Sequence, residues 1–298
     1  MPHPLLSWSN PAVRTLAATI ATAYGAQVAC AAFAVPMQTE KYYDLSGGAT
    51  FIGCTVMSLY YPALHAKFVQ GKSVPFPAIT SFHPRQLLLS GFTILWAGRL
   101  SSFLFQRIQK HGSDSRFDDI KPYPLKFFGA WMAQATWVTL TALPCFLVNS
   151  IPARLQPGLG IRDFVGVGLW IGAFLFEAIA DRQKSAWRAE KEAKKHDEPF
   201  IKSGLWSLSR HPNYFGEVSM WASQYIVATT ALAGPGAATV FPTYFVALAA
   251  ISPIFEYCLI RYASGVPMLE KAQDKKMGDD PAWKKYKAET PVFVPKLP

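Results

Sequence analysis

Seven apolar runs of roughly 20 residues restrict the fold of this 298-residue chain more than any other feature. A helix needs about 20 apolar residues to cross the ~30 Å hydrocarbon core of a bilayer. The chain is 51% hydrophobic and only 16% charged, whereas globular chains carry roughly 25% charged residues. The pattern predicts an all-α, polytopic membrane bundle of about seven transmembrane helices, over residues 12–35, 46–66, 86–106, 125–149, 161–180, 214–234 and 238–260.

Details within these runs refine the prediction. The first run is longer than the 7–15-residue apolar region of a signal peptide, so we expect a retained helix. Residues 182–195 lack Gly and Pro and should continue the fifth span into the aqueous phase. Prolines inside the runs predict kinks or breaks, which membrane bundles tolerate when neighbours satisfy the freed carbonyls. These are Pro62, Pro144, Pro242 and Pro253.

The net charge of +10 is concentrated on one side of the predicted topology. With seven spans, the loops on the C-terminal side hold 21 Lys and Arg residues, and the opposite side holds 6. Cytoplasmic loops are enriched in Lys and Arg, so the C-terminus is predicted to be cytosolic. The charge is therefore interpreted as a topology signal, and no nucleic-acid partner is expected.

Cysteine usage offers no metal or disulfide pattern. Cys30, Cys54, Cys145 and Cys258 lie far apart in apolar runs, without a CxxC pair or an adjacent His. Metal-site spacing is absent, so we expect small buried hydrophobic residues and no metal.

Ionisable side chains at membrane depth are the first candidates for function, because burying them in lipid is costly. Four residues of the fifth span and its extension follow at i, i+4, i+7 and i+11, which places them on one helix face. That face is acidic within the membrane and basic outside it; an internal ladder of salt bridges is the alternative interpretation. The intramembrane groups are Arg99, Glu177, Asp181, Glu217 and Glu256, and Lys184 and Arg188 complete the face.

A second polar cluster precedes the sixth span, in the segment GLWSLSRHPNYFGE at 204–217. It combines hydrogen-bond donors, an aromatic face and a cation at a helix N-terminus, which favours an anionic ligand. Interfacial aromatic residues and a topogenic arginine are the alternative interpretation. The candidate binding residues are Trp206, Arg210, His211, Asn213, Tyr214 and Glu217.

The segment at 204–217 resembles the C-terminal signature of membrane-embedded steroid and sterol reductases, and more closely that of their relatives in the DUF1295 family. Further motifs fit: W-x-x-R-L at 96–100, D-x-R at 114–116, F-E-x-x-A-D-x-Q-K at 176–184, and W-x-x-Y-K at 283–287 before P-x-F-x-P at 291–295. The resemblance covers about residues 86–298, which leaves 1–85 as an N-terminal transmembrane hairpin region. A shorter RHPxYxG core also occurs in isoprenylcysteine-type and phospholipid methyltransferases.

The resemblance implies a steroid-reductase-like C-terminal half that binds NADPH from the cytosol, with a lipophilic substrate among the helices. It implies that Lys184 and Arg188 contact cofactor phosphates and that Glu177 and Asp181 face the ribose and adenosine. It further implies that the residues lining the diphosphate and the nicotinamide are Arg210, His211, Asn213, Tyr214 and Glu217. Arg99 would also reach the cofactor.

One position departs from the steroid reductases. Trp96 stands where they carry a tyrosine that polarises the ketone, and an indole cannot protonate the product. The substitute donors considered are Tyr60, Tyr61, His65 and Tyr214, and the catalytic residue is left unassigned.

We therefore expect an NADPH-dependent oxidoreductase of the endoplasmic reticulum membrane that reduces a lipophilic, steroid- or lipid-like substrate at an activated C=C bond. The alternatives are an S-adenosylmethionine-dependent lipid or isoprenylcysteine-type methyltransferase and a non-catalytic lipid-binding protein. The sequence specifies neither the substrate nor the oligomeric state.

Overall fold

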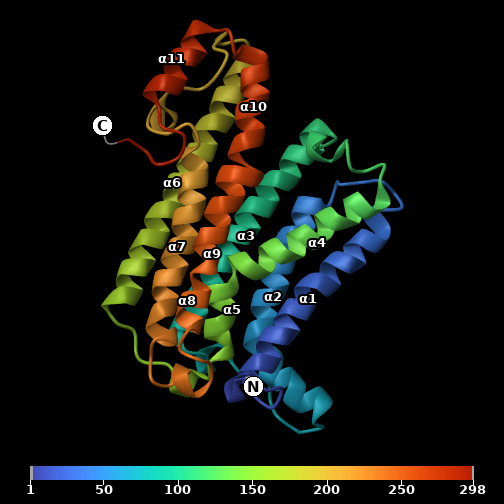
Figure 1. Cartoon of the computed structure of the whole chain (residues 1–298), viewed down its shortest axis with the longest axis vertical. Helices are drawn as coiled ribbons and strands as arrows, with labels where there is room; N and C mark the ends of the chain where they lie inside the picture. The colour runs from blue at the N-terminus through green and yellow to red at the C-terminus, as the bar shows by residue number, and fades with distance from the viewer. Residues whose placement is uncertain (1–2, 297–298) are drawn as a thin grey trace. The chain divides into compact units, whose positions relative to one another are not determined.

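The computed structural model describes residues 3–296, except for the side chains of His111 and Ser115, and these residues form helices and connecting loops without any strand. Figure 1 shows the chain, which divides into two compact units. Unit 1 contains residues up to 164 together with 225–252, and unit 2 contains 165–224 and 253 onward. The division predicted at residue 85 followed the extent of the family motifs and stays a prediction.

Unit 1 is a bundle of antiparallel and crossing helices. Its long members are α1 (Pro11–Ala34), α2 (Tyr43–Leu64), α3 (Pro84–His111) and α4 (Pro124–Thr141), followed by the short α5 (Leu143–Ser150). Helix α2 packs between α1 and α3, and α4 packs on α1 (Figure 1). The short α8 (Phe245–Ala249) packs on α5 and completes the unit.

Buried aromatic rings and polar side chains fill this bundle. Phe51 stacks edge-on against Trp96 and Trp137, with ring centroids 5.0 and 4.9 Å apart. The last carbonyls of α5, which a helix end leaves without internal partners, accept from the side-chain amides of Gln86 and Gln156. Polar groups buried in a bundle require such partners.

Unit 2 contains most of α6 (Ile161–Glu192) and the first part of α7 (Pro212–Leu232). Helix α9 (Ile251–Cys258) runs through a π-helical turn toward α10 (Val266–Met277), and α11 (Pro281–Glu289) follows. Helix α6 extends without a break from apolar to charged sequence, so the predicted continuation of the fifth span over 182–195 is confirmed as far as Glu192.

Among residues 3–296, four helices are long and apolar enough to cross a membrane: Pro11–Ala34, Pro84–Lys110, Ile161–Glu192 and the continuous stretch Phe245–Met277. The pair α4 and α5 is a fifth candidate if the two form one span, and it bends by 58° just before Pro144, where a kink was predicted. Helices also occupy the predicted second and sixth spans, as α2 and α7. The chain is thus an all-helical membrane protein, and the number seven stays a prediction.

One predicted span begins later than expected. The run at 238–260 contains a short 3-10 turn at Ala237–Thr239, and the α-helix starts only at Phe245. Pro242 lies between them and cannot donate a helical hydrogen bond, which accounts for the interruption.

Candidate functional site

The connection between α6 and α7 folds back onto α6 and positions a tryptophan there. Gly204 has φ of +60°, a left-handed conformation that glycine adopts without strain. The next amide, of Leu205, donates to Oε1 of Gln183 at 2.9 Å, and the indole of Trp206 donates to the carbonyl of Ala180 at 3.0 Å. The Nζ of Lys184 lies 4.2 Å from the centroid of the Trp206 ring, a cation–π contact.

The beginning of α7 packs closely against α6. Gly216 permits this approach, since a Cβ there would lie 2.8 Å from the Cβ of Glu177 and 3.0 Å from the carbonyl of Ala173. One turn earlier, Nδ2 of Asn213 donates to Oδ1 of Asp181 at 3.1 Å. The two sequence clusters predicted as candidate sites therefore meet along this helix contact.

Arg210 connects the α6–α7 segment to the C-terminal helices. Its Nε and Nη2 lie 3.1 and 3.2 Å from the two carboxylate oxygens of Glu270 on α10. Its Nη1 donates to the carbonyls of Lys287 and Thr290 at 2.7 and 3.0 Å, and its backbone amide donates to Pro291 at 2.9 Å. Most of this guanidinium is therefore committed to holding the C-terminal segment.

His211 shares the same carboxylate. Its Nε2 lies 3.0 Å from Oε1 of Glu270, and its ring stacks on Tyr214 with centroids 5.7 Å apart. Burial lowers the pKa of His211 below its ordinary value, although the hydrogen bond to Glu270 opposes the shift. A neutral imidazole that donates from Nε2 to Glu270 fits this arrangement.

The segment after α11 runs beside the residues that precede α7. Ser209 Oγ donates to the carbonyl of Phe293 at 2.8 Å, and the amide of Lys296 donates to Leu208 at 2.9 Å. Phe293 is buried in a cluster with Ile260 and Val266. These contacts fix the C-terminal segment on unit 2.

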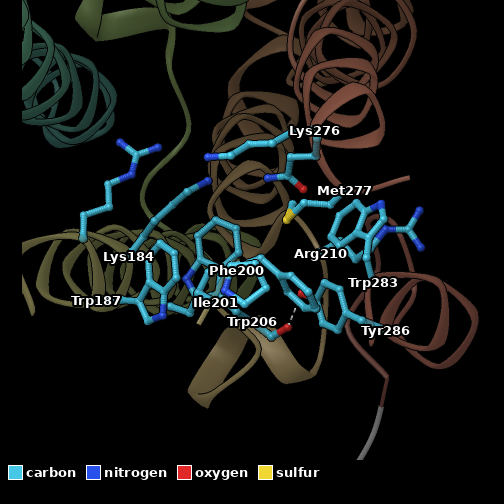
Figure 2. Close-up of a pocket in the computed structure, with 13 residues that line it drawn as sticks. Lys184, Trp187, Phe200, Ile201, Trp206, Arg210, Lys276, Met277, Trp283 and Tyr286 are labelled. Carbon is cyan, nitrogen blue, oxygen red and sulfur yellow. Dashed lines mark hydrogen bonds between the residues drawn. The ribbon is translucent and has the colours of Figure 1, made fainter. Parts of the chain in front are cut away.

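A cavity of about 150 Å³ opens among α6, the loop at 199–206, α10 and α11. Figure 2 shows Lys184 and Trp187 on one side, Met277, Trp283 and Tyr286 on the other, and Phe200 with Trp206 between them. Aromatic and aliphatic side chains form its walls, and no described residue that lines it is a carboxylate. Its four cations are Lys184, Arg188, Arg210 and Lys276.

The structure gathers ten of the eleven predicted binding residues in unit 2. Lys184, Arg188, Trp206 and Arg210 line the cavity itself. The other six lie on the α6–α7 contact and at the beginning of α7: Glu177, Asp181, His211, Asn213, Tyr214 and Glu217. Arg99 belongs to α3 in unit 1.

Sequence reasoning missed several members of the site. The carboxylate of Glu270 contacts both Arg210 and His211, and α10 and α11 supply five of the thirteen residues that line the cavity. The W-x-x-Y-K motif at 283–287 was a usable signal, because Trp283 and Tyr286 both line the cavity. Other missed lining residues are Trp187, Pro199, Phe200, Ile201, Gln273, Lys276 and Met277.

Trp96 occupies a different environment, in unit 1. It is 1% exposed and borders a second, smaller cavity of about 20 Å³, which has the volume of roughly one water molecule. The polar side chains around that cavity are Asp44, Ser101 and Gln134. Of the four alternative proton donors, Tyr60 packs on Phe82, Tyr61 lies against His65, and Tyr214 stacks on His211.

Fold and site together define a class: an all-helical membrane protein with an aromatic, cation-rich cavity at the end of a long helix. The family model described as a protein of unknown function, DUF1295, matches residues 39–290, well over half of the chain. The chain belongs to this family, and the match begins before residue 86, where the motif resemblance was taken to start. No curated protein and no solved structure matches the chain.

Proposed function

We propose that unit 2 binds NADPH and that the protein is an NADPH-dependent membrane reductase of a lipophilic substrate. The observation that supports this proposal is the cavity, which combines four cations with aromatic walls and has no carboxylate among its described lining residues. Cations bind phosphate by charge-assisted hydrogen bonds, and aromatic side chains pack on flat rings. A phosphorylated nucleotide offers both kinds of group.

The fit to a whole dinucleotide is partial. Ligand pockets for drug-sized molecules measure roughly 300–1,000 Å³, whereas this cavity measures about 150 Å³. It therefore suits one part of the cofactor, with Lys184, Arg188 and Lys276 as the cations that meet phosphate. Arg210 contributes less directly, since its guanidinium is largely engaged by Glu270 and backbone carbonyls.

The remaining binding residues would serve the rest of the cofactor. The family resemblance assigns the nicotinamide side to His211, Asn213 and Glu217, and a carboxylate at Glu217 can accept from the carboxamide. When bound, the cofactor supplies a hydride, while the protein supplies orientation and a dry environment. The buried state of Glu217, 8% exposed, and of His211, 3% exposed, is compatible with these roles.

The substrate class follows from the setting. Helices that face lipid admit a lipophilic molecule from the bilayer, and we propose an activated C=C bond as the bond reduced. Trp96 gives no proton, so a 3-keto-steroid handled by the usual tyrosine is disfavoured, and a steroid- or lipid-like molecule polarised otherwise is preferred. We further propose seven spans, a cytosolic C-terminus and residence in the endoplasmic reticulum.

An S-adenosylmethionine-dependent methyltransferase is the alternative, since it would share the RHPxYxG core. Its cofactor carries no phosphate and gains little from the cations around the cavity. Thermal unfolding with NADPH or S-adenosylhomocysteine separates the two, because a ligand that binds only the folded state raises Tm. We expect NADPH to stabilise the protein and S-adenosylhomocysteine to leave Tm unchanged.

The same experiment includes a matched pair of variants. Arg188→Ala should remove most of the NADPH stabilisation, whereas Lys285→Ala, an exposed lysine of α11 outside the cavity, should retain it. Stabilisation by S-adenosylhomocysteine alone would overturn the proposal in favour of the methyltransferase. NADPH oxidation by membranes containing the protein tests for turnover, and lipid binding without turnover would support the non-catalytic alternative.

A further inference from the structure

The cavity of unit 2 is closed on one side by a short helix that contributes two large aromatic side chains to its wall. Trp283 and Tyr286 of α11 line the cavity, and Trp283 is only 1% exposed. With about 150 Å³ inside, the cavity cannot take up a dinucleotide while α11 keeps this position. Either the ligand stays largely outside, or this wall moves.

Helix α11 rests on a small hydrophobic cluster of its own. Phe200, Met277 and Trp283 form that cluster, and Tyr286 packs against it. The cluster is separate from the one around Ile260, Val266 and Phe293, which holds the C-terminal segment on α7. Satellite clusters with few buried partners open at lower free energy than a main core. The helix can therefore separate without disrupting the second cluster.

Polar contacts hold α11 against α10. The Nζ of Lys287 lies 2.8 Å from both carboxylate oxygens of Asp274, and the indole of Trp283 donates to the same carboxylate at 2.8 Å. Lys287 also lies 3.5 Å from Glu270. The side chains of Asp274 and Lys287 are 44% and 32% exposed, so water competes for these contacts.

Two turns flank the helix and can serve as hinges. Gly278 and Asp279 separate α10 from the N-cap of α11 at Asp280, whose side chain accepts from Ala282. At the other end α11 stops at Thr290, immediately before the amide of Arg210 anchors Pro291. Opening this segment must also break two bonds besides those to Asp274: the Tyr286 hydroxyl donates to the carbonyl of Trp206 at 2.6 Å, and Nη1 of Arg210 donates to the carbonyl of Lys287 at 2.7 Å. The bond from Arg210 to the carbonyl of Thr290 lies at the hinge itself.

We propose that residues 278–290 form a hinged lid over the aromatic cavity, latched by Asp274 and Lys287, which must open for the nucleotide to enter. This inference rests on the proposed function for the ligand, whereas the motion itself can be measured without any ligand. The lid swings on the Gly278–Asp280 and Thr290–Pro291 turns. It exposes Trp283 and Tyr286 when open and packs them over the bound ring when closed.

Hydrogen exchange of the full chain in detergent micelles tests the motion. Local opening predicts that the α11 amides exchange about tenfold or more faster than those of the first turns of α7. Lys287→Met should speed α11 exchange several-fold and leave α7 unchanged, because it removes the ammonium that contacts Asp274 and Glu270 and keeps the backbone carbonyl that Arg210 holds. Asp274→Asn removes the charge of the α10 partner in the same contact and should speed α11 exchange as Lys287→Met does. With two variants, a folding defect in one does not end the test.

Lys285→Met is the matched control. It makes the same substitution on the same helix, at a side chain that is 74% exposed and whose nearest carboxylate is Glu289 at 3.9 Å. It should leave exchange of α11 unchanged. If α11 exchanges at the rate of α7 in the parent protein and in both latch variants, the lid is refuted.

Stopped-flow quenching of tryptophan fluorescence with NADPH tests the consequence for entry. The latch variants should raise the association and dissociation rates together by several-fold, with a smaller change in Kd. Unchanged rates alongside faster exchange would refute the gating role. If NADPH does not bind at all while α11 still opens locally, the proposed cofactor is wrong and the mobile lid stands.

Discussion

The guanidinium of Arg85 lies 2.6 Å from the carboxylate of Asp163, and the two side chains are 0% and 1% exposed. Arg85 is the second residue of α3, and Asp163 lies in the first turn of α6, 78 residues later. The guanidinium also donates to the carbonyls of Pro157 and Gly158, so a single side chain organises the loop before α6. The described hydrogen bonds of this pair lie within unit 1.

Removing one partner of this ion pair should therefore lower the free energy of unfolding far more than removing both. Arg85→Met leaves a buried carboxylate uncompensated, and the expected loss is about 3–5 kcal/mol of unfolding free energy. The double variant Arg85→Met/Asp163→Leu should recover part of that loss. Denaturant unfolding followed by tryptophan fluorescence measures each value. Equal destabilisation of the single and double variants would show that the ion pair is not the cause.

The positions of the helices and of two of their interruptions were more predictable than the geometry of those interruptions. The apolar run and the absence of Gly and Pro after residue 181 predicted α6 correctly into its charged end. The prolines predicted interruptions near residues 144 and 242, but the angle of the α4–α5 bend and the restart at Phe245 depend on how neighbours satisfy the backbone groups there. That information lies in tertiary packing rather than in hydropathy.

The residues of the candidate site also fall into those that the sequence could group and those that it could not. Residues close in sequence, such as Asp181 and Lys184 or Asn213 and Glu217, could be grouped by helical spacing. The contribution of Glu270 could not, because it lies 60 residues from Arg210 and looks like one charge among many on α10. Trp283 lies still farther from Arg210 along the chain, and only its motif marked it.

Gly48 predicts a sharp steric requirement where α2 meets α3. A Cβ at this position would lie 1.5 Å from Oγ and 2.6 Å from Cβ of Ser101. Gly48→Ala should cost about 1–3 kcal/mol of unfolding free energy, as overpacking does in close-packed interiors. Ser101→Gly in the same chain should relieve most of this cost. Gly53→Ala on the same helix has nothing within 4 Å of the added Cβ and should be neutral or slightly stabilising.

An acidic cluster outside the apolar helices predicts how stability depends on pH. Burial would raise the pKa of Glu40, but the amide of Asp114 at 2.9 Å and the ammonium of Lys121 outweigh it and lower that pKa. Burial would also raise the pKa of Asp114. The hydrogen bonds and the charge of Arg116 outweigh burial and lower this pKa. A carboxylate whose pKa is lower in the folded state stabilises the fold above its unfolded pKa, near 4, and loses this contribution as pH falls.

Thermal unfolding between about pH 6 and pH 3 measures that dependence. Stability of the parent protein should fall as the pH drops through and below 4, and Glu40→Gln should flatten part of this decline. The same substitution at Glu289, an exposed carboxylate at the end of α11, should leave the acid limb unchanged. If stability falls equally steeply with decreasing pH in all three proteins, Glu40 is not a source of this pH dependence.

The cations of the cavity predict a preference among nucleotides. NADPH carries a phosphate on the adenosine ribose that NADH lacks, and hydrogen bonds to charged groups contribute roughly 1.5–3 kcal/mol. Lys276→Ala and Arg188→Ala should therefore weaken NADPH binding by about tenfold or more, which corresponds to 1.4 kcal/mol per factor of ten. NADH binding should change less in at least one of the two variants, and that variant identifies the cation that meets the extra phosphate.

Fluorescence titration at two salt concentrations measures the binding of both ligands, and Lys285→Ala serves as the charge-matched control on α11. Equal losses for NADPH and NADH in both variants would place the extra phosphate away from this cavity.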